Sequence, residues 1–194
     1  MTHSPRRIST LLAALVLGAA VTPLATACAQ RDARTRVDTT FAFNKGGWVD
    51  LGLVSGEITV TGWTRPEARV IASVERDGYL ETTFSENRIY IHTRSRSRRL
   101  GEARYEIMVP IGARVQASST SGRIRIKATA GEVQANSVSG HIEVLDAADR
   151  IELSTVSGDV HAEKLSGRTR IHTTSGDLQT SDITGDLSMH SVSS

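Results

Sequence analysis

The chain has 194 residues, of which 39% are hydrophobic, 4% aromatic and 23% charged, and its formal net charge is +2. This length suits one ordinary domain behind a leader, and the abundance of Gly, Ser and Thr favours short strands and tight turns over helices. Arg6 and Arg7 are the only charged residues before Arg31, so removing them leaves 21 basic and 21 acidic residues. That balance argues against a nucleic-acid partner.

Residues 1–29 have the features of a secretory signal peptide. Arg6 and Arg7 supply the positive n-region, residues 11–21 form an apolar run too short to span a membrane, and small residues follow at 25–27. We therefore expect an exported protein of the periplasm or cell envelope. Residues 30–36 are predicted to be a linker.

Cys28, the single cysteine, follows Leu24-Ala25-Thr26-Ala27, a sequence that resembles a bacterial lipobox. In one interpretation the signal is cut before Cys28, which carries a lipid and anchors the chain to a membrane. In the other, cleavage after Ala27 or Ala29 leaves Cys28 without a role. Either way no disulfide can form within the chain, so the fold has no covalent cross-link.

Residues 37–120 are predicted to form a less regular β portion that caps the repeats described below. Turn signals lie at 44–47, 64–66 and 77–78, and residues 55–60, Ser-Gly-Glu-Ile-Thr-Val, copy the later repeat unit. The expected strands are 37–43, 48–54, 57–61, 68–75, 88–93 and 103–109.

Arg94, Arg96, Arg98 and Arg99 form the strongest charge run. In an exported chain they are candidates for contact with the phosphates of lipopolysaccharide or anionic lipid. The alternative is a solvated loop between two strands. Nucleic acid is not expected, because no aromatic residues are interleaved with the arginines.

Residues 121–194 form a regular repeat. Ser-Gly pairs begin at residues 121, 139, 157 and 175, a spacing of 18, and Gly131, Asp149, Gly167 and Gly185 lie halfway between. The unit is therefore nine residues. Asp tolerates a left-handed backbone better than most residues, so Asp149 suggests that the halfway position needs a positive φ.

Two apolar columns, two and four residues after each glycine position, have the alternation of a strand with one face inward. We expect an all-β fold, a β-solenoid of 18-residue coils with two strand-turn units each. Outward positions pair Glu132 with Arg150 and Arg168 with Asp186 on neighbouring coils. A third inward column is expected at Thr129, Val138, Ala147, Val156, Leu165, Thr174, Ile183 and Val192.

With its leader, the strand Tyr105–Pro110 and the Ser-Gly units, the chain resembles the bacterial putative-adhesin family of exported β-strand-repeat proteins, a domain of unknown function. The resemblance covers residues 37–194 and implies a β-solenoid in the cell envelope. It brings no catalytic residues. Members commonly continue further or end in a cap, whereas this sequence stops within a unit at Ser194, which suggests a truncated product or a partner surface.

No enzyme, cofactor or metal site is predicted. Calcium-binding repeats need Gly-Gly-x-Gly-x-Asp, and each turn here has one glycine. His172 and His190 should stack on one outer face, but a third ligand is lacking. Ser157, Asp159 and His161 share a strand without forming a pocket.

We therefore expect a non-catalytic envelope protein, an adhesin or interaction scaffold for an envelope protein or glycan. Its contact surface is predicted to be the hydroxyl ladder of Ser137, Thr155, Thr173 and Ser191. One alternative is a self-assembling scaffold that associates through the C-terminal end of the solenoid. Others are an accessory role in envelope stress and, less favoured, a carbohydrate-active β-helix enzyme.

Overall fold

The computed structural model describes residues 32–75, 78–95 and 101–192, which form an all-β structure. The predicted signal peptide, Cys28, Arg96, Arg98 and Arg99 lie outside these residues. No helix that is long and apolar enough to cross a membrane occurs in the described part of the chain.

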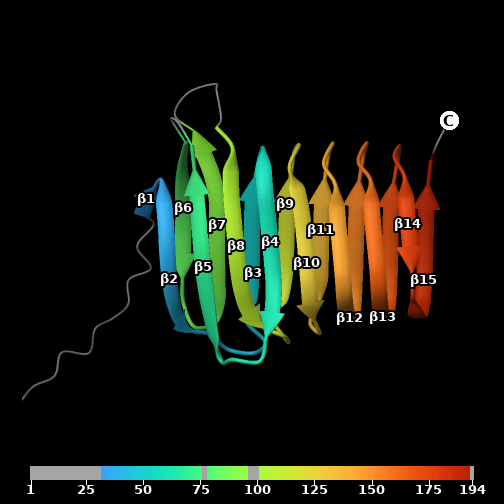
Figure 1. Ribbon diagram of the computed structural model, residues 1–194, viewed down its shortest axis with the longest axis horizontal. Helices are drawn as coiled ribbons and strands as arrows, with labels where there is room; N and C mark the ends of the chain where they lie inside the picture. Colours follow the sequence, from blue (N-terminus) through green and yellow to red (C-terminus); the bar gives the residue numbers. More distant parts are fainter. Residues whose placement is uncertain (1–31, 76–77, 96–100, 193–194) are drawn as a thin grey trace, which may run out of the picture.

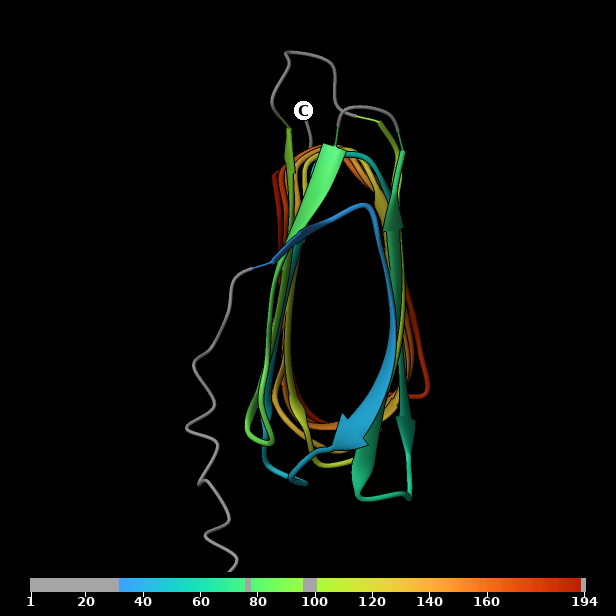
Figure 2. The ribbon, with the colours of Figure 1, turned by 90° about the vertical axis from the view of Figure 1, so that its left-hand side faces the viewer.

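The strands wind into a flattened tube, seen from the side in Figure 1 and along its axis in Figure 2. Its two broad walls are connected by turns along two narrow edges. In chain order the strands are β1 (Asp32–Arg34), β2 (Arg36–Ala42), β3 (Trp48–Leu53), β4 (Gly56–Trp63), β5 (Glu67–Val74), β6 (Gly78–Phe84), β7 (Arg88–Ser95), β8 (Ala103–Pro110), β9 (Arg114–Ser119), β10 (Arg123–Thr129), β11 (Val133–Ser137), β12 (Ile142–Thr155), β13 (Val160–Thr173), β14 (Leu178–Ser181) and β15 (Thr184–Ser191).

Strand pairing assigns every strand except β12 and β13 to one wall. The first wall runs β2, β5, β8, β4, β10, the first half of β12, the first half of β13 and β14. The second wall runs β1, β6, β7, β3, β9, β11, the second half of β12, the second half of β13 and β15. β12 and β13 each bend around a narrow edge and so contribute to both walls.

The repeat region is stacked in parallel with a constant register. On the first wall Ile124 pairs with Ile142, Ile142 with Val160 and Val160 with Leu178, and each step is 18 residues. Asp149, Gly167 and Gly185 have φ values of 80°, 99° and 111°, which confirms the positive φ predicted from Asp149 at these three halfway positions but not at Gly131.

The Ser-Gly turns bring successive backbones into close contact along the other narrow edge. A Cβ placed on Gly140 would lie 1.8 Å from the carbonyl oxygen of Gly122, and one on Gly158 would lie 1.8 Å from that of Gly140. No side chain fits in that space. Glycine is therefore required at this position by the approach of the neighbouring coil.

The prediction of a third inward column is wrong at the Ser-Gly edge and correct at the opposite narrow edge. Ala147 and Leu165 are buried, but Val138 and Val156 are 47% and 48% exposed. At the Ser-Gly edge the preceding residue points inward instead: Ser137 and Thr155 are 6% and 1% exposed. The two halves of a coil therefore end in different turns, although their sequences repeat.

The less regular part begins in the middle of the stack, beside β9 and β10, and extends to β1 and β2. β4 lies between β8 and β10, and β3 lies between β7 and β9, all in parallel pairs. Beyond them β5 pairs antiparallel with β8 and β2, and β6 pairs antiparallel with β7 and β1. The turns expected at 44–47 and 64–66 are present between strands. β6 was not expected, because its inward positions include Thr82 as well as Leu80.

Aromatic side chains close the core at the β2 end. Phe43 is buried, and Phe41 contacts both Phe43 and Phe84 with ring centroids 6.2 and 5.5 Å apart. Further inside, Tyr105 donates a 3.0 Å hydrogen bond to the carbonyl of Gly52, and its hydroxyl also bonds Thr93. Burial raises the pKa of Tyr105 far above its ordinary value.

Candidate interaction surface

The predicted hydroxyl ladder is not a contact surface. Ser137, Thr155 and Thr173 are buried, and only Ser191, on the outermost strand β15, is exposed. The Oγ of Ser137 accepts a 2.9 Å hydrogen bond from the backbone N–H of Gly140, and Thr155 does the same for Gly158 at 3.1 Å. These hydroxyls close the Ser-Gly turns from within. Strand alternation could have shown this, since residue 155 follows the inward residues 151 and 153 by two-residue steps.

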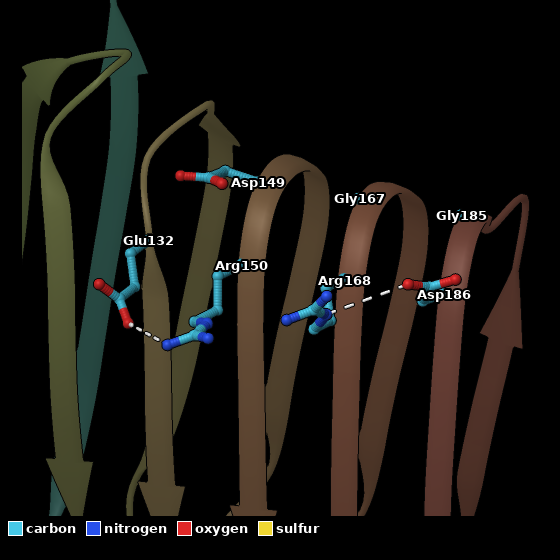
Figure 3. A pocket seen from close by; sticks show the side chains of 7 residues that line it. All are labelled: Glu132, Asp149, Arg150, Gly167, Arg168, Gly185 and Asp186. Carbon is cyan, nitrogen blue, oxygen red and sulfur yellow. Dashed lines mark ion pairs between the residues drawn. The ribbon is translucent and has the colours of Figure 1, made fainter.

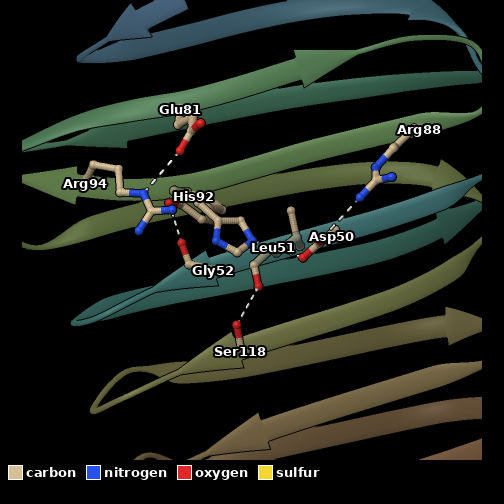
Figure 4. Close-up of polar contacts among 9 residues, drawn as sticks. Asp50, Leu51, Gly52, Glu81, Arg88, His92, Arg94 and Ser118 are labelled. Atoms are coloured by element: carbon tan, nitrogen blue, oxygen red, sulfur yellow. Dashed lines mark hydrogen bonds and ion pairs between the residues drawn. The ribbon is translucent and has the colours of Figure 1, made fainter. Parts of the chain in front are cut away.

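Arg94 is the one residue of the predicted arginine run that the structure describes. It points outward from β7, where its Nε donates a 3.1 Å hydrogen bond to Glu81 across the β6–β7 hairpin (Figure 4). Its contact with a phosphate remains a prediction. Such a contact would have to compete with Glu81.

A polar cluster around Asp50 lies on the second wall near Arg94 (Figure 4). Asp50 accepts from His92 Nε2 at 3.0 Å and pairs with Arg88 at 3.7 Å. The His92 ring packs over Gly52, where a Cβ would lie 2.7 Å from the ring. Ser118 donates to the Leu51 carbonyl at 3.2 Å rather than to His92. The serine, histidine and aspartate are therefore not connected as nucleophile, base and orienting acid.

The other histidines of the described residues lie on the outer surface. The rings of His172 and His190 stack with centroids 5.0 Å apart, as their spacing predicted. His141 Nδ1 lies 3.1 Å from Asp159, while His161 lies 3.9 Å from Glu163, so Ser157, Asp159 and His161 do not converge. Within residues 32–75, 78–95 and 101–192, no three His, Cys, Asp or Glu side chains are placed to hold a metal ion.

A row of charged and aromatic residues crosses the second wall beside the narrow edge opposite the Ser-Gly turns. Strand register places Trp48 beside Arg114, Arg150 beside Arg168, and Arg168 beside Asp186. Val133 lies between Val115 and Ile151 in the register. The residues just before these three are Glu132, Arg114 and Arg150, so Glu132 lies between the two arginines. We call Trp48, Arg114, Glu132, Arg150, Arg168 and Asp186 the charge row.

The charge row borders a shallow depression of about 630 Å³, which Asp149, Gly167 and Gly185 also line (Figure 3). Arg150 reaches to Glu132 at 3.9 Å, and Arg168 to Asp186 at 4.0 Å. The two arginines are nearest neighbours in the register, and each has its acid on the far side. Two guanidinium groups therefore stand side by side without a carboxylate between them.

The charge row has three arginines, Arg114, Arg150 and Arg168, and two acids, Glu132 and Asp186, and a third acid, Asp149, also lines the depression. Its ion pairs are long and solvent-exposed, and pairs of that kind contribute about 0–1 kcal/mol each. At the other end Arg114 stacks over Trp48, with 5.7 Å between the guanidinium carbon and the ring centroid. The sequence predicted both acid–base pairs, but the arginine–arginine neighbourhood was missed because each pair was considered alone.

Comparison with known proteins gives one family match. Residues 55–193 match the family model described as Toastrack DUF4097. Among solved structures, the chain is similar to a putative cell adhesion protein from Clostridium sporogenes, with 7% identity, a TM-score of 0.40, and coverage of 80% of this chain and 100% of that one. It is also similar to a putative lipid binding protein from Parabacteroides distasonis, with 13% identity, a TM-score of 0.33, and coverage of 82% and 97%. No protein with a curated description matches.

Proposed function

We propose that this chain, which belongs to the Toastrack family, is a non-catalytic, exported cell-envelope protein that binds an acidic partner through the charge row. The observation that carries this proposal is the adjacency of Arg150 and Arg168 on a rigid wall. Neighbouring strands lie about 4.8 Å apart, so one carboxylate or phosphate can contact both guanidinium groups.

The wall itself supports recognition. Arg150 and Arg168 project from β12 and β13, which pair from Ile142 to Thr155 without a break other than residue 146. Backbone held by hydrogen bonds on both sides loses little freedom on binding, so the arginines are presented at a fixed spacing. Trp and Arg are also the residue types that most often dominate binding energy at protein interfaces.

The partner's acid would replace the flanking acids of the row. Glu132 and Asp186 hold the arginines only by exposed contacts near 4 Å. A bidentate carboxylate placed between the arginines would form shorter, charge-assisted hydrogen bonds. The proposal therefore identifies an acidic segment of an envelope protein as the partner, with an acidic glycan as the alternative.

Charge reversal tests this proposal. Arg150→Glu together with Arg168→Glu should abolish chemical cross-links between the exported protein and its envelope partner in a producing bacterium, as identified by mass spectrometry. The matched control is Arg36→Glu with Arg69→Glu, which changes two exposed arginines near the β2 end by the same charge. If the row variant keeps every cross-link that the wild type makes, the charge row is not the contact surface.

We also propose that Cys28 anchors the mature chain to a membrane through a lipid, as the lipobox-like sequence suggests. The intact mass of the membrane-associated protein should then exceed that of the unmodified chain by a diacyl or triacyl group. Cys28→Ala should move the protein into the soluble fraction. An unmodified mature chain that begins after Ala27 or Ala29 would contradict lipid anchoring.

A second candidate function is self-association through β14 and β15. These strands have no neighbour on their outer edge among the described residues, and Leu187 and Met189 are 39% and 50% exposed. Antiparallel pairing of β15 between two copies, centred on Ser188, sets Asp186 of each copy opposite His190 of the other and Leu187 opposite Met189. Asp186 can then accept a hydrogen bond from His190 on the outer face, while the inward apolar side chains face one another.

Sedimentation velocity tests this association. The wild type should form a dimer as its concentration rises, and Leu187→Lys with Met189→Lys should remain monomeric. Val138→Lys with Val156→Lys adds the same charge at exposed apolar positions away from this edge, and should still dimerise. A wild type that is monomeric at high concentration would contradict the candidate function.

A further inference from the structure

An apolar pocket of about 540 Å³ lies among the turns near the capped end of the tube. Five turns contribute to it: 43–47 between β2 and β3, 64–66 between β4 and β5, and 111–113 between β8 and β9, with Glu86 from the β6–β7 turn and Ala130 from the β10–β11 turn. These turns lie at the narrow edge opposite the Ser-Gly turns, and the β4–β5 turn is visible at the bottom of Figure 1. The pocket shares no residue with the charge row.

Backbone hydrogen bonds between the turns hold the pocket walls in place. The N–H of Phe43 donates to Pro66 at 3.2 Å, that of Ile111 to Trp63 at 3.0 Å, and that of Ala130 to Ile111 at 2.6 Å. Because each bond joins two different segments of the wall, the pocket is preformed. Its volume is in the range of ligand sites for small organic molecules.

The walls are mostly apolar. Phe43, Trp63, Pro66, Pro110 and Ile111 all line the pocket. The indole Nε1–H of Trp63 already donates to the Glu67 carbonyl at 2.7 Å, so Trp63 offers the pocket its ring carbons. A ligand with an apolar body is the chemical match for these walls.

The rim of the pocket has an excess of positive charge. Lys45 and Arg65 lie there with one acid, Glu86. Arg65 contacts Glu67 at 3.3 Å and stacks on Trp63, with 5.1 Å between the guanidinium carbon and the ring centroid. Lys45 has no carboxylate partner among the described residues, and its stem packs against Gly112, where a Cβ would lie 3.1 Å from Lys45 Cγ. The ammonium group is thus free to bind an anion.

We propose that this pocket binds a small amphipathic anion, an alkyl carboxylate, with its chain against Trp63, Pro66 and Ile111 and its carboxylate at Lys45 and Arg65. Neither half of the ligand would suffice. The walls give the chain a place out of water, and the rim distinguishes a carboxylate from a neutral or cationic head group.

Titration calorimetry with decanoate, below the concentration at which it forms micelles, tests the pocket. The wild type should bind one decanoate per chain. Ala130→Phe projects a ring into the pocket from an exposed position and should weaken binding at least about tenfold. The control is Ala148→Phe, the same position one coil further on and outside the pocket, which should bind as the wild type does. Thermal melting of both variants checks that they fold.

The head group is tested separately. Lys45→Ala should weaken decanoate binding about fivefold and leave the binding of decan-1-ol unchanged, since an exposed ion pair contributes up to about 1 kcal/mol. Lys127→Ala, a lysine on the first wall outside the pocket, should have no effect on either ligand. Equal effects of Lys45→Ala on acid and alcohol would overturn the assignment to an anion.

The two tryptophans of the chain allow an optical readout. In Trp48→Phe the remaining tryptophan, Trp63, lies in the pocket wall, and its fluorescence should change and saturate with decanoate. In Trp63→Phe the remaining tryptophan, Trp48, lies outside the pocket and should not respond. Decanoate binding that Ala130→Phe does not weaken, or a response from Trp48 alone, would overturn the proposed pocket.

Discussion

The two ends of the tube differ in how their last strands and inward side chains are covered. A parallel stack leaves unpaired backbone groups and inward side chains at each end. At the β2 end the chain changes to antiparallel pairs, and Phe41, Phe43 and Phe84 pack together over the core. At the β15 end the register continues unchanged, and the inward residues Leu187 and Met189 are partly exposed.

This difference shows that regular repetition stabilises the middle of the tube but not its ends. Within the stack, each coil covers the apolar side chains of its neighbour and pairs with its backbone. An end needs residues that break the repeat, such as the phenylalanines beside β2. The described residues of β14 and β15 instead keep the repeat, so their stability should depend on one neighbour only.

The largest effect should come from breaking the close approach of coils in the regular region. Gly140→Ala places a Cβ 1.8 Å from the Gly122 carbonyl oxygen and should lower the free energy of unfolding by about 4 kcal/mol or more. Gly46→Ala, in a turn beside the capped end where a Cβ meets nothing within 4 Å, should be nearly neutral. Urea denaturation of both variants measures the difference, and similar losses would show that coil contact does not require glycine.

Truncating the cap should cost more than truncating the open end. Phe43→Ala removes a ring that is 2% exposed and should lower the free energy of unfolding by about 3–5 kcal/mol. Met189→Ala, at a site 50% exposed, should lower it by less than about 1 kcal/mol. Denaturation of the two variants under conditions that keep the protein monomeric tests this order. A larger loss for Met189→Ala would mean that β15 is covered in solution.

Tyr105→Phe tests how much the buried polar contact of the less regular part contributes to stability. Losing the hydroxyl that bonds Thr93 and Gly52 should cost about 1–3 kcal/mol at neutral pH. Burial also raises the pKa of Tyr105 above its ordinary value of 10.0. Above about pH 10 the unfolded chain therefore loses this proton while the folded chain keeps it, and stability falls as pH rises.

The variant lacks this titration, so its stability should fall less steeply between pH 9.5 and about 11.5 than that of the wild type. Tyr79 and Tyr90 are present in both proteins, and their contribution cancels in the difference. Parallel alkaline slopes in urea denaturation would show that the Tyr105 hydroxyl ionises as readily in the folded as in the unfolded chain.

The smallest effect is expected at two neighbouring positions of the buried hydroxyl ladder. Thr155→Val removes the hydroxyl that accepts from Gly158 and should cost about 1 kcal/mol. Thr173, one coil nearer the β15 end, has a buried Oγ1 without a hydrogen-bond partner among the described residues, so Thr173→Val should be neutral or stabilising. Equal losses in thermal melting would indicate that the Thr173 hydroxyl is bonded in solution.

The regular region was predictable because its signals are local. The 18-residue spacing of Ser-Gly pairs corresponds to the observed strand register, and Asp149 indicated a positive φ that the structure contains. The family match confirms the resemblance drawn from the Ser-Gly units and residues 105–110. The predicted hydroxyl surface was wrong because the repeat was followed instead of strand alternation, which places Thr155 inward beside Ile151 and Leu153.

The sequence by itself determined the strand period, the coil length and the glycine positions, because each depends on residues that recur at a fixed distance along the chain. Only the tertiary structure decided that β3 and β4 lie in the middle of the stack and that five separate turns contribute to one pocket. These features join residues far apart in the chain, and their positions follow from how the walls close around the core. No local pattern encodes that closure.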